Sequence, residues 1–101
     1  MDRVAISVNG VPIRLTEERW FHITEHHVEM AGHATTVLTA IEAPDFVAEG
    51  WEGELLAVKR VQRRHLIVAY REVSPTDGFV ITAFFTRNVR GWVERNRLWP
   101  P

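Results

Sequence analysis

Three of the five histidines in this chain lie within six residues, in the segment Arg19-Trp20-Phe21-His22-Ile23-Thr24-Glu25-His26-His27. Histidine titrates near neutral pH, so it can accept a proton and return it within one catalytic cycle. Its neutral ring is also a common metal ligand. The segment is therefore compatible with a metal site, an acid–base pair or an ordinary solvated helix face.

A metal site needs more ligands than this segment supplies. His22 and His26 are four residues apart, so a helix places both on one face. In the usual zinc motif H-E-x-x-H, a glutamate follows the first histidine, whereas this chain has Ile23 there. The chain has no cysteine, so a further ligand would have to be His33, His65 or a carboxylate. We therefore expect no metal and no cofactor.

Helical spacing divides the histidines between two faces. His22 and His26 fall on a polar face, whereas His27 shares a stripe with Trp20 and Ile23 that is expected to face the sheet. His22 and His27 are about 140° apart around an unbroken helix. They can reach one site only if the helix ends or bends near His26. Spacing alone favours solvated residues at 22 and 26 and a core position at 27.

The composition is that of a single soluble domain spanning residues 1–101. No apolar stretch is long enough for a signal peptide or a membrane span, so we expect a cytoplasmic protein with no membrane partner. Residues 1–54 carry ten acidic and three basic side chains, and residues 55–101 carry nine basic and three acidic ones. The basic half is compatible with a polyanion partner, or with internal compensation by the acidic half.

The first half of the chain predicts a β-hairpin and two helices. Asn9-Gly10 separates two apolar runs, which indicates a hairpin, and Pro12 suggests that the second strand is an edge. Thr16 is expected to cap a helix that runs to about His27. A second helix is expected from Met30 to Ile41, before Pro44.

The second half changes to a period of two. It predicts a short strand at 45–49 and longer strands at 55–61, 65–73 and 79–86, with 66–70 covered on both faces. The order of elements indicates an α+β fold: an N-terminal β-hairpin, two helices, then a mainly antiparallel four-stranded sheet with the helices packed on one face.

An ordered set of short motifs resembles the barnase–EndoU–colicin–RelE class of small ribonuclease domains, in the branch found in phage and bacterial polymorphic toxins. The similarity spans about residues 12–90 and leaves 91–101 as a C-terminal tail. Related sequences often carry proline after the second histidine, where this chain has Val28. The motifs are Leu15–Trp20, His22-Ile23, His27, Glu29-Met30, Ala43-Pro44-Asp45, Val58-Lys59-Arg60, Leu66–Tyr70 and Phe79–Arg87.

The resemblance implies metal-independent cleavage of RNA, in which the ribose 2′-hydroxyl attacks the adjacent phosphate. It also implies a toxin effector, with RNA as substrate and an acidic antitoxin or immunity protein as partner. The implied catalytic residues are His22, His27, Lys59 and Thr82, and the implied substrate-binding residues are Arg60, Tyr70, Thr86 and Arg87. Because side chains alternate along a strand, Lys59 and Arg60 point to opposite faces, and we favour Lys59.

Two alternatives remain open from the sequence: a non-catalytic RNA- or protein-binding module of the same fold, and a metal hydrolase with histidine ligands. The tail interleaves arginines with Trp92 and Trp99. This pattern suits stacking on unpaired bases, but tryptophans also dock a terminus onto a core. We expect at least one of the two to dock.

Overall fold

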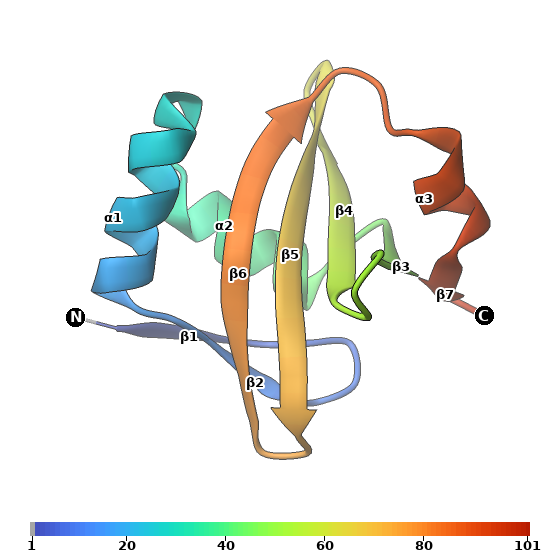
Figure 1. Ribbon diagram of the computed structural model, residues 1–101, viewed down its shortest axis with the longest axis horizontal. Helices are drawn as coiled ribbons and strands as arrows, with labels where there is room; N and C mark the ends of the chain where they lie inside the picture. The colour runs from blue at the N-terminus through green and yellow to red at the C-terminus, as the bar shows by residue number, and fades with distance from the viewer. Residues whose placement is uncertain (1) are drawn as a thin grey trace.

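The computed structural model describes residues 2–101, which form one seven-stranded sheet in the order β1-β2-β6-β5-β4-β3-β7 (Figure 1). The strands are β1 (Arg3–Ile6), β2 (Pro12–Leu15), β3 (Phe46–Glu49), β4 (Leu55–Val61), β5 (Arg64–Ser74), β6 (Asp77–Thr86) and β7 (Arg97–Trp99). The helices are α1 (Glu17–His26), α2 (Ala34–Glu42) and α3 (Gly91–Arg95), with a 3-10 turn at Val28–Met30. No helix within residues 2–101 is long and apolar enough to cross a bilayer.

The α+β class is confirmed, but the prediction of four strands with helices on one face is wrong. The N-terminal hairpin joins the same sheet as the later strands, because β2 pairs with β6 in parallel at Ile13–Gly78 and Arg14–Phe79. Glycine is required here, since a Cβ at Gly78 would lie 2.5 Å from Cδ1 of Ile13 in β2 and 2.4 Å from the backbone oxygen of Arg71 in β5. The tail adds β7, which pairs with β3.

The hairpin forms at the predicted turn, where Gly10 has a φ of +79°. However, the edge strand is β1 rather than β2. Pro12 is tolerated because it pairs only with Ile6 of β1, one residue before the pairing with β6 begins at Ile13.

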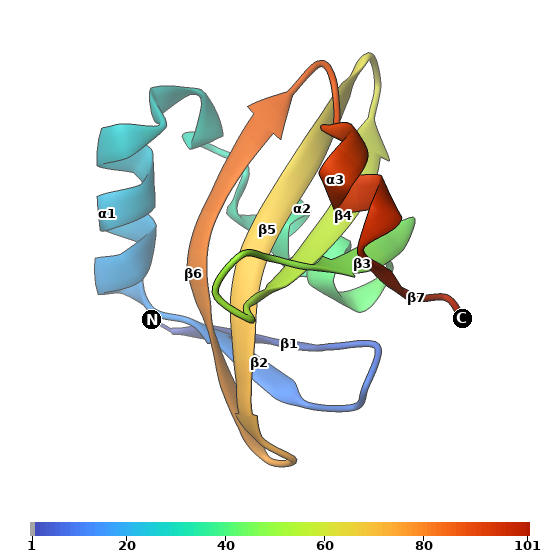
Figure 2. The ribbon, with the colours of Figure 1, turned by 45° about the vertical axis from the view of Figure 1, so that its right-hand side comes forward.

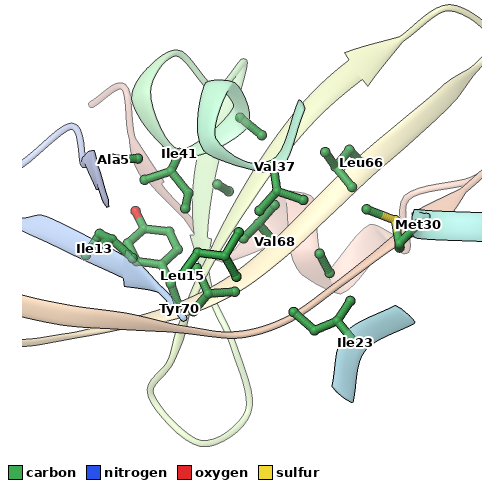
Figure 3. Packing of buried hydrophobic residues seen from close by; sticks show 14 of the residues in the cluster. Ala5, Ile13, Leu15, Ile23, Met30, Val37, Ile41, Leu66, Val68 and Tyr70 are labelled. Atoms are coloured by element: carbon green, nitrogen blue, oxygen red, sulfur yellow. The ribbon is translucent and has the colours of Figure 1, made fainter. Parts of the chain in front are cut away.

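The sheet is covered differently on its two faces. Its larger core lies on the α2 face, where Val37 and Ile41 of α2 pack with Leu66, Val68 and Tyr70 of β5 (Figure 3). On the other face, α3 packs against a smaller cluster, made of Phe46, Ala48, Val58, Ile67 and Val93. In both ribbon views α1 lies beside β6, where β2 no longer pairs with it (Figures 1 and 2). Since both faces contribute to a core, β5 is buried from Leu66 to Tyr70, as predicted.

Local signals explain where α1 begins and where the next helix starts. The Thr16 hydroxyl accepts a hydrogen bond from the Arg19 backbone N–H at 3.0 Å, which confirms the predicted cap. The second helix begins at Ala34 instead of Met30. Gly32 has a φ of +82°, a conformation that breaks a helix, and the 3-10 turn at Val28–Met30 precedes it.

The attachment of α1 to the sheet depends on one buried side chain of that helix, Ile23, which is 1% exposed. We expect Ile23→Ala to lower the free energy of unfolding by about 2–5 kcal/mol, measured by urea denaturation, because it leaves a cavity. Phe21→Ala is the matched control, since Phe21 is 65% exposed on the same helix, and should change it by about 0.5 kcal/mol at most. Equal losses in the two variants would contradict this packing.

Candidate functional site

His22 and His26 form a stacked pair on the exposed side of α1, as their spacing predicts. Their ring centroids are 4.4 Å apart, with the rings inclined at 43°. His26 Nδ1 lies 3.1 Å from the backbone oxygen of His22, within hydrogen-bond distance. Neither ring nitrogen of His22 has a hydrogen-bond partner within residues 2–101. The His22 ring is therefore positioned by its tilted contact with the His26 ring, while its nitrogens remain available.

The helix ends at His26, and His27 leaves the helical path. Its backbone angles are φ −131° and ψ 80°, although its N–H still bonds to the Ile23 oxygen at 2.8 Å. The following turn carries Met30 into the core, where it is fully buried. The end of α1 therefore forms with Val28, and not proline, at the position after His27.

The same turn directs His27 toward β6. The centroid of its ring lies 5.7 Å from that of Phe84, which belongs to the sheet face opposite α2. Its Nδ1 lies 3.8 Å from a carboxylate oxygen of Glu29. His27 is half-buried, so it is not the core residue that spacing alone suggested.

The helix end brings His22 and His27 to one depression of about 230 Å³. Thr82 of β6, the third predicted catalytic residue on this side of the molecule, lines the same depression. The structure thus brings together three of the four residues predicted as catalytic. The full lining consists of Arg19, His22, Ile23, His26, His27, Ile81 and Thr82.

Arg19 is the cation of this site, and the sequence interpretation missed it. Its Nη1 donates a hydrogen bond across to the backbone oxygen of Ile81 at 3.3 Å. Within residues 2–101 its guanidinium forms no ion pair, so its charge is available to an anion. The spacing held a signal, because Arg19, His22 and His26 recur at i, i+3 and i+7 on one helix face.

Lys59 does not reach this depression. It lies on the α2 side of the sheet, where its Nζ donates a hydrogen bond to the Ala43 oxygen at the end of α2, at 2.7 Å. Arg60 points the other way, as alternation predicts, and its Nε donates to the Gln62 oxygen at 3.0 Å. Each cation is therefore hydrogen-bonded to a nearby backbone oxygen, Lys59 at the end of α2 and Arg60 in the turn after β4. Neither side chain lines the histidine depression.

The predicted substrate-binding residues are dispersed. Tyr70 is fully buried in the α2-side core (Figure 3), so RNA cannot touch it in this fold. Thr86 lines a separate groove on the opposite face, where its hydroxyl donates to the Asn88 oxygen at 3.0 Å. Arg87 lines a basic depression of about 540 Å³ with Arg63 and Arg64.

The metal alternative finds no ready ligand set in the part of the chain that the structure describes. No group of three or more His, Cys, Asp or Glu side chains there lies close enough together to hold an ion.

No protein-family model, curated protein or solved structure matches the chain. The fold defines a small α+β protein, and any role must be inferred from the chemistry of its surfaces.

Tyr70 yields a prediction because its hydroxyl is buried without a hydrogen-bond partner within residues 2–101. Tyr70→Phe removes an unsatisfied polar group, so we expect the free energy of unfolding to rise by about 1 kcal/mol. Burial, together with the Glu72 carboxylate, raises the pKa of the phenol well above its ordinary value. The folded state therefore resists ionisation, and wild type should lose stability relative to the variant as the pH rises above about 10.

Urea denaturation of both proteins across this pH range checks the prediction, and Tyr70 is the only tyrosine of the chain. A variant less stable than wild type at neutral pH would show that the hydroxyl has a partner after all. A constant difference between the two proteins above pH 10 would contradict the raised pKa.

Proposed function

We propose that this chain is a small metal-independent endoribonuclease, with His22 and His27 as its acid–base pair. One observation carries the proposal: α1 ends at His26, so two histidines that an unbroken helix would separate line one depression. Two imidazoles at one small site can divide the two proton transfers of a phosphodiester cleavage between them. The resemblance of the sequence to small ribonuclease domains supports the same chemistry.

The reaction balances with groups present at the site. One imidazole removes the proton of the ribose 2′-hydroxyl, whose oxygen then attacks the adjacent phosphorus. The bond from phosphorus to the 5′-oxygen breaks, and the second histidine, as imidazolium, donates its proton to that oxygen. The products are a 2′,3′-cyclic phosphate and a free 5′-hydroxyl. No metal or oxidant takes part in these steps.

Arg19 takes the role that the sequence interpretation gave to Lys59. A guanidinium beside the phosphate stabilises the negative charge that builds on its oxygens in the transition state. The hydrogen bond to Ile81 holds the side chain over the depression before substrate arrives. Thr82 of β6 lines the same depression, and in this proposal its hydroxyl donates a hydrogen bond to a phosphate oxygen.

The test is cleavage of a fluorescently labelled single-stranded RNA in excess chelator. We expect wild type to cleave it, and His22→Ala and His27→Ala each to lower kcat/KM by at least about 100-fold, because each removes one proton-transfer group. Arg19→Ala should reduce the rate strongly, and Arg19→Lys should recover part of it. The product should carry a cyclic phosphate, detectable by mass spectrometry.

Two matched variants control for folding. His33→Ala removes a histidine whose ring packs edge-on against Phe85 outside the depression, and Lys59→Ala removes the cation bound to Ala43. Both should lose stability rather than activity. Full activity of His22→Ala and His27→Ala, or cleavage only with added divalent metal, would overturn the proposal. Loss of activity in Lys59→Ala at unchanged stability would restore the original assignment.

As a toxin-like effector, the protein would require a neutralising partner in cells that make it. The depression formed by Arg63, Arg64 and Arg87 offers an acidic inhibitor a complementary surface, because no ion pair within residues 2–101 neutralises these arginines.

A binding module of the same fold is the second candidate. The observation in its favour is a groove lined by aromatic side chains on the sheet face opposite α2.

A further inference from the structure

A groove of about 560 Å³ crosses the sheet face opposite α2, and it has no part in the proton transfers proposed above. Its floor is formed by Leu56, Ile67 and Phe84 of the sheet. Figure 2 shows the two elements that stand in front of β5 on this side, the β3–β4 turn and α3. These elements contribute one tryptophan each, Trp51 and Trp92.

Trp51 is 83% exposed, an unusual position for the largest apolar side chain. The turn that carries it is nevertheless fixed by hydrogen bonds. The Gly50 N–H bonds to the Glu54 oxygen at 2.8 Å, and the Arg71 guanidinium donates to the Glu52 oxygen at 3.1 Å. An exposed indole on a well-anchored turn is a preorganised contact surface, because little conformational freedom remains to be lost when it binds.

Trp92 supports Trp51 from α3. The two ring centroids are 5.1 Å apart, and Val93, which is 3% exposed, anchors the helix to the sheet. Trp92 itself is half-buried against the same cluster. This arrangement confirms the expectation that at least one tail tryptophan docks, and it leaves the Trp51 ring open to a planar ligand.

The polar groups on the rim suit a nucleotide. The Arg90 guanidinium and the Asn88 amide have no hydrogen-bond or ion-pair partner within residues 2–101, so they can bind a phosphate and a base edge. Two acidic residues of the β3–β4 turn, Glu52 and Glu54, also line the groove, and the Glu54 carboxylate accepts a hydrogen bond from the Glu52 N–H at 3.1 Å. A cationic and an amide group thus face the groove from the α3 side.

Phe84 connects the groove with the histidine site. It lines the groove, and its ring is also the one that His27 contacts. An extended strand with its phosphate at His22 and His27 would therefore carry a neighbouring base over Phe84 toward Trp51. A base-paired duplex cannot insert a single base in this way, because its bases are stacked on one another.

We propose that this groove binds one unpaired base of a single-stranded RNA, stacked on Trp51, with the adjoining phosphate at Arg90. That the ligand is RNA rests on the proposed function. The groove adds that the RNA substrate is single-stranded. Aromatic stacking tolerates all four bases, so the groove supplies affinity rather than sequence preference.

The test measures binding rather than cleavage. The probe is a short, labelled, single-stranded deoxyoligonucleotide, which lacks the attacking 2′-hydroxyl, and the readout is fluorescence anisotropy. Loss of one stacked base predicts that Trp51→Ala raises Kd by about 5- to 150-fold. Trp51→Phe should stay within about threefold of wild type, because a smaller aromatic ring still stacks.

Val73→Ala is the control, since it removes another exposed apolar side chain, one that lines neither the groove nor the histidine depression, and it should leave Kd unchanged. A duplex of the same sequence should bind more weakly than the single strand. Unchanged affinity of Trp51→Ala, or duplex binding as tight as single-strand binding, would overturn the inference. An equal loss in Val73→Ala would do the same.

The result of this binding test can be distinguished from the result of the cleavage test. If Trp51→Ala loses affinity while wild type fails to cleave RNA, the groove stands and the protein is a binding module. If wild type cleaves RNA and Trp51→Ala keeps both its affinity and its KM, the nuclease stands and the groove is not a base site.

Discussion

The candidate site depends on the burial of Ile23 and Met30, two side chains that hold the chain against one core on either side of His27. Between them α1 ends at His26, and a 3-10 turn at Val28–Met30 follows. The same turn gives His27 its non-helical backbone and brings its ring to Phe84. Ile23 holds the preceding helix against the same core. The geometry of the histidine site therefore follows from apolar packing and requires no strained residue.

The two faces of the sheet are covered to different extents. Helix α2 covers one face, whereas α3 covers only part of the other. The closed face contains the larger core and the end of α2, where Lys59 is bound. The open face presents Phe84 between the histidine depression and the tryptophan groove. A ligand that spans both concave regions would gain from two sites on one rigid sheet, which neither site alone provides.

Features set by local signals were predictable from the sequence. The Asn9-Gly10 turn, the Thr16 cap and the strand at 55–61 depend on neighbouring residues, and the structure confirms each. The parallel pairing of β2 with β6 and the addition of β7 join residues far apart in the chain. Their formation depends on close approach at Gly78 and on docking of α3, which no periodicity records.

Part of the candidate site was also predictable from the sequence, because it depends on the spacing of residues along one helix. Spacing correctly separated the polar face of His22 and His26 from the buried Ile23. It could not show that the helix ends at His26, because residues 28–30 continue the apolar spacing of Ile23 although they form a 3-10 turn. Lys59 was expected from the resemblance, and alternation showed only that it and Arg60 face opposite sides of the sheet; the end of α2 lies on the Lys59 side. Arg19 shares the spacing of His22 and His26 and could have been identified.

The most direct test of a shared histidine site is whether His22 and His27 respond to one phosphate. Uridine 3′-monophosphate is titrated into the protein, and the ring proton resonances of the histidines are followed by NMR. The account predicts that the resonances of His22 and His27 shift with a single Kd, while those of His33 and His65 stay constant. Shifts in only one of the pair, or two different dissociation constants, would contradict a shared site.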